Sequence, residues 1–196
     1  KYVGDAMVIF FGDPDSLGVK EDALACVSMA IEMRQRMQAL ERVWMEAGLE
    51  TPLKCRMGIN TGICTVGNFG SEDRMDYTII GGGVNLAARL EKSCPPSEIL
   101  ISYETYSHVK DTISCQLEGQ IQAKGFHEPV STYRVIDFHE SLEEDRRPIR
   151  ASSEHMRLEV EIENMSEEER RTAAKTLRET AAHLENTKHQ EPSPDR

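Results

Sequence analysis

The sequence lacks the features that mark several common classes of protein. None of its five cysteines forms a Cys-x-x-Cys pair, and none of its six histidines stands in His-x-x-x-His spacing. We therefore expect reduced thiols, with neither a disulfide scaffold nor a zinc site. The sequence also has no Gly-x-Ser-x-Gly elbow and no P-loop, which argues against serine hydrolases and P-loop nucleotidases.

Positive charge and long apolar runs are also scarce. The 196 residues include 23 Lys and Arg against 34 Asp and Glu, a net charge of −11. This balance leaves no basic excess for generic binding to nucleic acid or to an anionic membrane. No run approaches the roughly 18 apolar residues that a membrane helix requires, so we expect no membrane insertion by this segment.

The first 138 residues alternate between helical and extended patterns, which predicts one domain over residues 1–138. Apolar side chains at helical spacing predict helices, at residues 22–45, 84–92 and 103–109. Apolar or alternating runs predict strands, at residues 6–11, 53–59, 64–68, 75–80, 98–101, 113–122 and 132–138. The turn residues 60–62 predict that 53–59 and 64–68 form a hairpin. The fold class is therefore α+β, with a mixed, mainly antiparallel sheet and packed helices.

The character of the chain changes after residue 138. Residues 139–165 are rich in charge and predict a linker. Ser166 and Glu169 have the spacing of a helix capping box, and a thin apolar stripe follows, so we predict a C-terminal helix at 166–186. Residues 187–196 have a disordered composition.

A few residues have types and spacings that suit chemistry, although each also has an ordinary structural explanation. Asp5 precedes an apolar strand, where a carboxylate is costly unless it is paired or binds a cation; a turn or cap role is the alternative. Asn85 and Arg89 share one helix face, which suits the reading of ribose and phosphate, and the alternative is a surface salt bridge. Lys124 and the glycine run 81–83 are weak signals by themselves.

Three motifs taken together are far more specific. They are KYVGDAMVIFFG at residues 1–12, RMGINTG at 56–62, and DYTIIG followed by VNLAARL within 76–90. In this order they resemble the catalytic domains of the class III nucleotidyl cyclases, the adenylate and guanylate cyclases, and the resemblance runs to about residue 137. It implies the palm-type, ferredoxin-like cyclase fold, here lacking its first elements and followed by a helical tail.

The resemblance implies a composite active site. In this family two catalytic domains pair head to tail, and two Mg²⁺ or Mn²⁺ ions per site are held by two aspartates of one subunit. Asp5 matches the second aspartate, whereas the first lies upstream of the motif and outside this sequence. The other subunit supplies the nucleotide readers: Asn85 matches the asparagine that orients the ribose, Arg89 the arginine that stabilises the phosphates, and Lys124 a phosphate-binding lysine. We therefore expect a homodimer with two symmetric sites.

The same resemblance implies that Lys1 and Thr78 recognise the purine base. A Lys ammonium donates to N1 of adenine, and a Thr hydroxyl accepts from the N6 amino group, whereas guanine presents the opposite pattern at both atoms. Guanylate cyclases usually carry Glu and Cys or another small residue at these positions. A Thr at position 78 resembles a bacterial-type group of adenylate cyclases, so we expect ATP as the substrate.

The expected function is cytoplasmic conversion of ATP to 3′,5′-cyclic AMP and pyrophosphate for signalling. Two departures from the family pattern bear on it. Gly82 and Gly83 replace the usual Asp-Thr, and the loop should be more mobile, with a cost to turnover or affinity. If residue 1 is the true start, a metal ligand and part of the sheet are missing, and we expect negligible activity from the isolated 196-residue chain.

Three other functions compete with this one. The first is a degenerate cyclase-homology domain that binds nucleotide or pairs with an active partner. The second is a diguanylate cyclase, although residues 81–85 lack the acids of its Gly-Gly-Asp/Glu-Glu-Phe signature. The third is an α+β interaction module whose glycines are purely structural.

Overall fold

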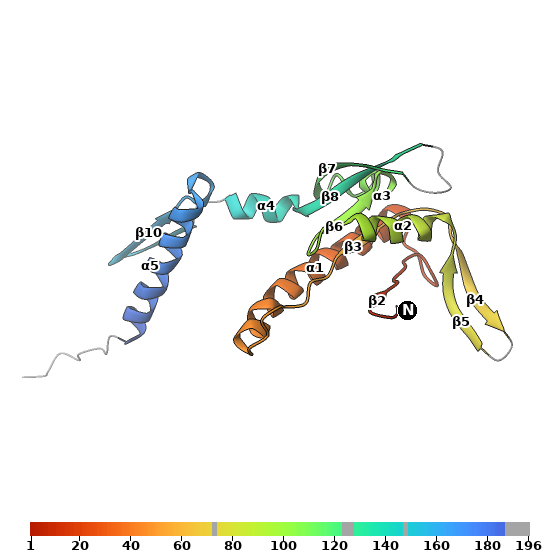
Figure 1. Cartoon of the computed structure of the whole chain (residues 1–196). Helices are drawn as coiled ribbons and strands as arrows, with labels where there is room; N and C mark the ends of the chain where they lie inside the picture. Colours follow the sequence, from red (N-terminus) through yellow and green to blue (C-terminus); the bar gives the residue numbers. More distant parts are fainter. Residues whose placement is uncertain (72–73, 123–127, 147–148, 187–196) are drawn as a thin grey trace, which may run out of the picture. The chain divides into compact units, whose positions relative to one another are not determined.

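A computed structural model describes residues 1–71, 74–122, 128–146 and 149–186 (Figure 1). The chain divides into two units, Lys1–His139 and Glu140–Arg196. The first unit contains a four-stranded sheet in the order β3 (Met57–Ile59), β6 (Ile99–Ser102), β8 (Val130–Phe138) and β7 (Ile113–Ile121). Because β3 and β6 are parallel and the other pairs are antiparallel, the sheet is mixed and mainly antiparallel, as predicted.

Two hydrophobic clusters hold helices on this sheet. The 28-residue helix α1 (Val19–Glu46) buries one stripe of small and branched side chains, which packs with α3 (Tyr103–Val109) and the sheet. The buried members of this cluster are Ala23, Val27, Ala30, Ile31, Ile99, Ile101, Val109, Ile113 and Val135. The second cluster joins α2 (Gly82–Ser93) to β6 through Leu86, Leu90 and Leu100, together with Cys94. Helix α2 is therefore fixed to the sheet by its apolar face.

The predicted hairpin between residues 53–59 and 64–68 is wrong. Strand β3 instead pairs in parallel with β6, through the register Met57↔Ile99 to Ile59↔Ile101. Strand β4 (Thr65–Ser71) pairs with β5 (Arg74–Ile80) over seven residues, forming a separate antiparallel hairpin. The turn at 60–62 therefore lies between strands of two different sheets. Strand β3 pairs with the buried strand β6, and β4 pairs with β5 in a longer ladder.

Other boundaries also differ from the prediction, and the strand expected at 53–59 is reduced to Met57–Ile59. The strand expected at 6–11 is reduced to β2 (Ala6–Met7), paired with β1 (Tyr2–Val3). Val8 still exchanges backbone hydrogen bonds with Lys1, but among the described residues no strand pairs with 9–11. Helix α2 begins at Gly82, two residues before its expected start, and the glycines therefore form its first turn.

The second unit contains more structure than the expected linker. Residues 139–165 include α4 (His139–Arg146), the antiparallel hairpin of β9 (Ile149–Ser153) and β10 (Met156–Val160), and a 3-10 turn at Ile162–Asn164. The hairpin forms because its residues alternate in character, with the pairs Ala151↔Leu158 and Arg150↔Glu159 on opposite faces.

The last described element is α5 (Glu167–Asn186). The predicted capping box is confirmed: the Ser166 backbone N–H donates to Glu169 Oε2 (2.7 Å), and the Glu169 N–H donates to Ser166 Oγ (3.3 Å). The predicted disordered tail at 187–196 lies outside the described residues. Within the described part of the chain, each helix is too short or too polar to cross a bilayer.

Candidate active site

The first residue of the chain contacts strand β5. Lys1 Nζ donates to Asp76 Oδ2 at 2.9 Å, which forms an ion pair between residues 75 positions apart. This hydrogen bond and the charge of Lys1 hold the pKa of Asp76 below its ordinary value. Because side chains two apart on a strand point to the same face, Asp76 and the half-buried Thr78 share one face of β5. The structure therefore brings Lys1 to the strand that carries Thr78.

A second contact holds the N-terminal segment against the same strand. The Tyr77 hydroxyl donates to Asp13, and the Tyr77 and Phe10 rings lie 6.3 Å apart at an angle of 48°. The hydrogen bond to the Asp13 carboxylate, with burial as a smaller cause, raises the pKa of Tyr77. Residues 1–13 are thus attached to β5 at Asp76 and at Tyr77.

Asn85 and Arg89 lie one turn apart on α2, as their spacing predicted. Asn85 is exposed in the first turn, and its backbone N–H donates to the carbonyl of Gly81 (3.3 Å). Arg89 is partly buried. Gly81, which precedes the helix, has φ of 149°, a conformation that other residues rarely adopt. An amide and a guanidinium on one helix face can contact two parts of the same ligand.

Strand β3 and the loop after it contact helix α2 and hold it in place. A Cβ on Gly58 would overlap the backbone nitrogen of Glu91 and would lie 2.5 Å from the carbonyl oxygen of Ala87, so the strand and the helix are in backbone contact. Asn60 Nδ2 donates to the carbonyl of Gly83 at 3.2 Å. Gly58 and Asn60 belong to the motif at 56–62, and their two-residue spacing is the signal in the sequence that could have indicated these contacts.

Asp5 lies in the turn between β1 and β2, after Gly4, whose φ is 63°. The carboxylate is exposed, so the expected cost of burial does not arise. Within the described residues no hydrogen bond or ion pair joins Asp5 to Asn85, Arg89 or Thr78. The described part of the chain also contains no group of three or more His, Cys, Asp or Glu side chains that would hold a metal by itself.

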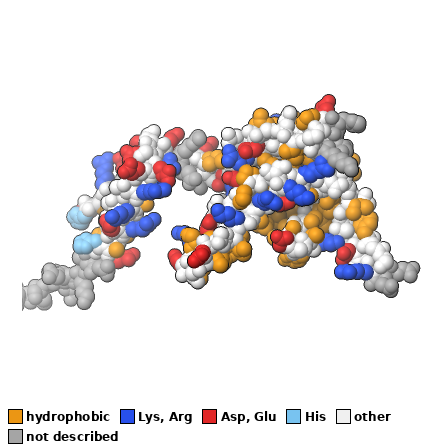
Figure 2. All heavy atoms as spheres, in the orientation of Figure 1, with side chains coloured by type: hydrophobic (Ala, Val, Ile, Leu, Met, Phe, Trp, Pro, Cys, Tyr) orange, Lys and Arg blue, Asp and Glu red, His pale blue; other side chains and the backbone are white. Residues whose placement is uncertain are grey.

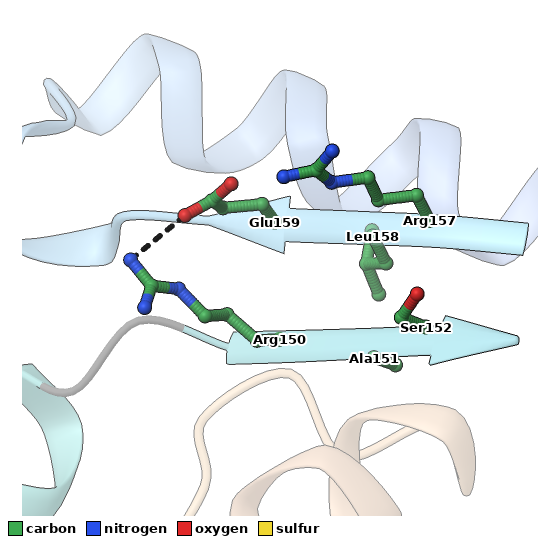
Figure 3. A pocket seen from close by; sticks show the side chains of 6 residues that line it. All are labelled: Arg150, Ala151, Ser152, Arg157, Leu158 and Glu159. Carbon is green, nitrogen blue, oxygen red and sulfur yellow. Dashed lines mark ion pairs between the residues drawn. The ribbon is translucent and has the colours of Figure 1, made fainter.

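Lys124 lies outside the described residues. The second unit has a hollow of about 500 Å³ on the β9–β10 hairpin, where Arg150 and Glu159 form an ion pair at 2.8 Å (Figure 3). The residues around it are Arg150, Ala151, Ser152, Arg157, Leu158 and Glu159. None of the predicted site residues lines this hollow, so the volume of a cavity does not by itself identify the active site.

Comparisons with known proteins agree with the motifs. The model of the family described as "Adenylate and Guanylate cyclase catalytic domain" matches residues 1–137. The solved structure of the adenylyl cyclase CyaB from P. aeruginosa is 58% identical, with a TM-score of 0.67 over 70% of each chain. The guanylyl cyclase Cya2 is 35% identical, with a TM-score of 0.58 over 66% of this chain and 64% of that one.

Two curated relatives are much longer than this chain. The terminal-differentiation-specific adenylate cyclase of Dictyostelium discoideum is 33% identical over 155 residues, which are 76% of this chain and 7% of that protein. Adenylate cyclase 1 of Rhizobium meliloti is 30% identical over 118 residues, 59% of this chain and 17% of the relative. The family match, the motif order and the mixed sheet agree, and the chain belongs to the class III adenylate and guanylate cyclase catalytic domain family.

Proposed function

We propose that this chain is the catalytic domain of an adenylate cyclase, which converts ATP to 3′,5′-cyclic AMP and pyrophosphate. Its membership of the cyclase family supports the reaction. The similarity to an adenylyl cyclase at 58% identity supports the choice of ATP over GTP. The structural observation that carries the proposal is the attachment of Lys1 to Asp76, beside Thr78 on β5.

Base recognition follows from the chemistry of these two side chains. The Lys1 ammonium is a donor for adenine N1, and the Thr78 hydroxyl accepts from the N6 amino group. A guanine base in the same place would set its N1–H against the ammonium and its O6 against a hydroxyl, which must turn to donate. We propose that Lys1 and Thr78 select ATP by this mismatch.

Asn85, Arg89 and Lys124 are proposed to act on the ribose and phosphates. Cyclisation requires the ribose 3′ hydroxyl to attack the α-phosphate in line with the departing pyrophosphate. The exposed Asn85 amide would orient the ribose for this attack. The charges of Arg89 and Lys124 would stabilise the negative charge that develops on the phosphate oxygens.

Asp5 is proposed as a ligand of divalent metal, in a site with two Mg²⁺ or Mn²⁺ ions. Mg²⁺ is commonly bound by one or two carboxylates together with substrate phosphates and water, so an exposed carboxylate in a turn fits as part of such a donor set. When bound, the metal lowers the pKa of the attacking hydroxyl and stabilises charge on the attacking and leaving oxygens. Asp5 itself would position the ion.

The site is proposed to form between two copies of the chain. One copy would contribute Asp5, and the other would contribute the base, ribose and phosphate readers. Figure 2 shows hydrophobic side chains gathered on the surface of the first unit. Exposed apolar residues on its N-terminal segment and on β5 are Tyr2, Val3, Met7, Ile9, Phe11, Met75, Tyr77 and Ile80. Exposed apolar side chains gathered on one segment and one strand favour a protein interface.

The proposal is tested by substituting the nucleotide readers in the intact protein. Asn85→Ala and Arg89→Ala are expected to lower kcat for ATP by about 100-fold, because each removes a contact to the reacting groups. Arg36→Ala, on an exposed part of α1, is the matched control and should retain activity. Cyclase turnover that survives both site substitutions would contradict the proposal.

A degenerate cyclase-homology domain is the second candidate, favoured by the glycines at positions 82 and 83. It predicts nucleotide binding or pairing without turnover, and the same assay with wild-type protein and Mn²⁺ separates it from an active enzyme.

A further inference from the structure

Helix α2, which carries Asn85 and Arg89, is contacted at three places by one short segment, residues 56–60. Arg56 Nε donates to Glu91 Oε1 at 2.6 Å near the C-terminal end of the helix. Gly58 brings the β3 backbone against the middle of the helix, at Ala87 and Glu91. Asn60 Nδ2 donates to the Gly83 carbonyl (3.2 Å) in the first turn. These contacts occur two residues apart, because alternate side chains of a strand point to one face.

The first turn of α2 has little intrinsic order. Its N-cap is Gly81, which has no side chain to accept from the free backbone N–H groups, and residues 82 and 83 are also glycines. Three successive glycines leave the backbone many alternative conformations. Its first turn also carries no acidic side chain that would interact with the helix dipole. Order at this end of the helix must therefore come from outside the helix.

The loop that carries Asn60 is itself fixed on its other side. Thr61 Oγ1 lies 3.1 Å from Thr105 Oγ1, and Thr105 Oγ1 lies 3.2 Å from Ser102 Oγ. Ser102 and Thr105 are fully buried, and Ser102 Oγ also accepts the Thr105 backbone N–H, which caps α3. This chain of hydroxyls, two of which are fully buried, connects the loop to the N-terminus of α3. Asn60 thus joins a fixed loop to a glycine-rich helix end.

We propose that Asn60 is a positioning residue for the cyclase reaction. By donating to the Gly83 carbonyl, it sets the direction in which the first turn of α2 presents Asn85, two residues further along. Arg56 and Gly58 hold the rest of the helix, so the loss of Asn60 releases the end with Asn85 while Arg89 stays near the docked middle. This inference rests on the proposed function of Asn85.

The geometry makes a specific demand on the side chain at position 60. The partner is a carbonyl oxygen, so the side chain must donate. Asp has nearly the shape of Asn but offers only acceptors at neutral pH, and its charge would face the carbonyl. Gln retains the amide donor on a longer stem. The order of activity Asn60, then Gln, then Ala and Asp distinguishes a donor that positions the helix from a side chain that only fills space.

The test measures kcat and KM for ATP in the intact protein with Asn60→Ala, Asn60→Asp and Asn60→Gln. We expect kcat to fall about tenfold for Ala and Asp, with KM changed less than about twofold, because orientation is lost rather than affinity. The unfolding midpoint should fall by only about 3 °C, as for the loss of one hydrogen bond. Asn60→Gln keeps the amide donor, so its kcat should fall by no more than roughly threefold.

Two comparisons keep this proposal separate from the proposed function. Gln116→Ala removes a different amide contact, the acceptor for Arg134 on exposed β7, and should leave kcat unchanged. Hydrogen exchange of the Asn85 amide, which donates to the Gly81 carbonyl, should accelerate in Asn60→Ala and stay unchanged in Gln116→Ala. Full kcat in Asn60→Asp, together with a loss in Asn85→Ala, would overturn the role of Asn60. Full kcat in both would instead overturn the role of Asn85 in catalysis.

Discussion

Lys1 and Asp76 form an ion pair at 2.9 Å, although 75 positions separate them in the sequence. The pair brings the first residue of the chain to β5, where Thr78 lies two residues beyond Asp76 on the same face. Two positions that family resemblance assigns to base reading thus come from distant motifs to one strand. Asp76 was not among the predicted site residues, and its role here is to hold the Lys1 side chain.

The pairing predicts a measurable titration of Asp76. Lys1 lowers the pKa of Asp76 in the folded chain, so the contribution of this pair to stability is present above the ordinary pKa of aspartate. This contribution is lost as the pH falls through the lowered pKa that Asp76 has in the folded chain. Lys1→Met should raise the pKa of Asp76 toward its ordinary value, which NMR of the carboxyl carbon will measure. Lys20→Met, which removes the exposed pair with Asp111, is the control and should leave Asp76 unchanged.

Substitution by alanine should have opposite effects on the free energy of unfolding at Gly58, in β3, and at Gly82, in α2. Gly58→Ala places a Cβ against the backbone of Glu91 and Ala87, and we expect a loss of about 1–3 kcal/mol in the free energy of unfolding. Gly82→Ala meets nothing within 4 Å and lies in the first helical turn, so it should gain about 0.4–1 kcal/mol by restricting the unfolded chain. Urea unfolding of both variants measures these changes. Equal effects would contradict the contact between β3 and α2.

Local patterns predicted helices well and strand partners poorly. Helix α3 has the predicted bounds, and α1 extends the predicted range by three residues at its start and one at its end, because helical spacing is a property of the segment itself. The partner of β3 depends on which distant strand reaches its edge, and the local turn at 60–62 wrongly indicated β4. Residues 139–165 show the same limit, since a charge-rich stretch that alternates in character still forms a hairpin.

The candidate site was predictable to the extent that motifs carry it. The spacing of Asn85 and Arg89 on one helix already indicated a shared face, and the structure places both on α2. Asp76 and Asn60 were missed as contacts, because each acts through a residue far away in the sequence. Hydrogen bonds such as that from Asn60 to Gly83 depend on the packing of α2 on β3, which no local pattern contains.

Three of the five cysteines, Cys26, Cys94 and Cys115, should be unreactive in the folded chain. Burial raises the pKa of Cys26, Cys94 and Cys115 to about 11. Since the thiolate is the reactive form, the thiolate fraction at pH 8 should be lower by about 100-fold than for a thiol of ordinary pKa. Iodoacetamide labelling followed by mass spectrometry should modify these three residues only after unfolding in urea. Labelling of any of them in native protein at the rate of the urea-unfolded sample would contradict their burial.

The same shift gives a prediction for stability at high pH. The folded pKa values of these thiols lie above the ordinary value of 9.0, so the neutral thiols contribute fully below about pH 9. Their contribution is lost as the pH rises from there toward 11, because the unfolded chain releases its thiol protons first. Cys26→Ala should flatten this alkaline decline in the unfolding midpoint, whereas Ser107→Ala, at a partly buried position of α3 without a thiol, should not.

The proposed site between two copies predicts that two inactive variants restore each other. Asp5→Ala lacks the proposed metal ligand from one copy, and Arg89→Ala lacks the proposed phosphate-binding residue from the other. In a heterodimer of the two, one site receives both defects and the other receives neither. Random exchange makes half of the dimers mixed, each with one intact site of two, so the mixture should recover about a quarter of wild-type activity. Cyclic AMP production by each variant alone and by the mixture measures this.

A mixture of Asn85→Ala with Arg89→Ala is the control. Both defects affect the residues that the same copy contributes, so no intact site forms and activity should stay low. Recovery in that control, or none in the first mixture, would contradict a site shared between two copies.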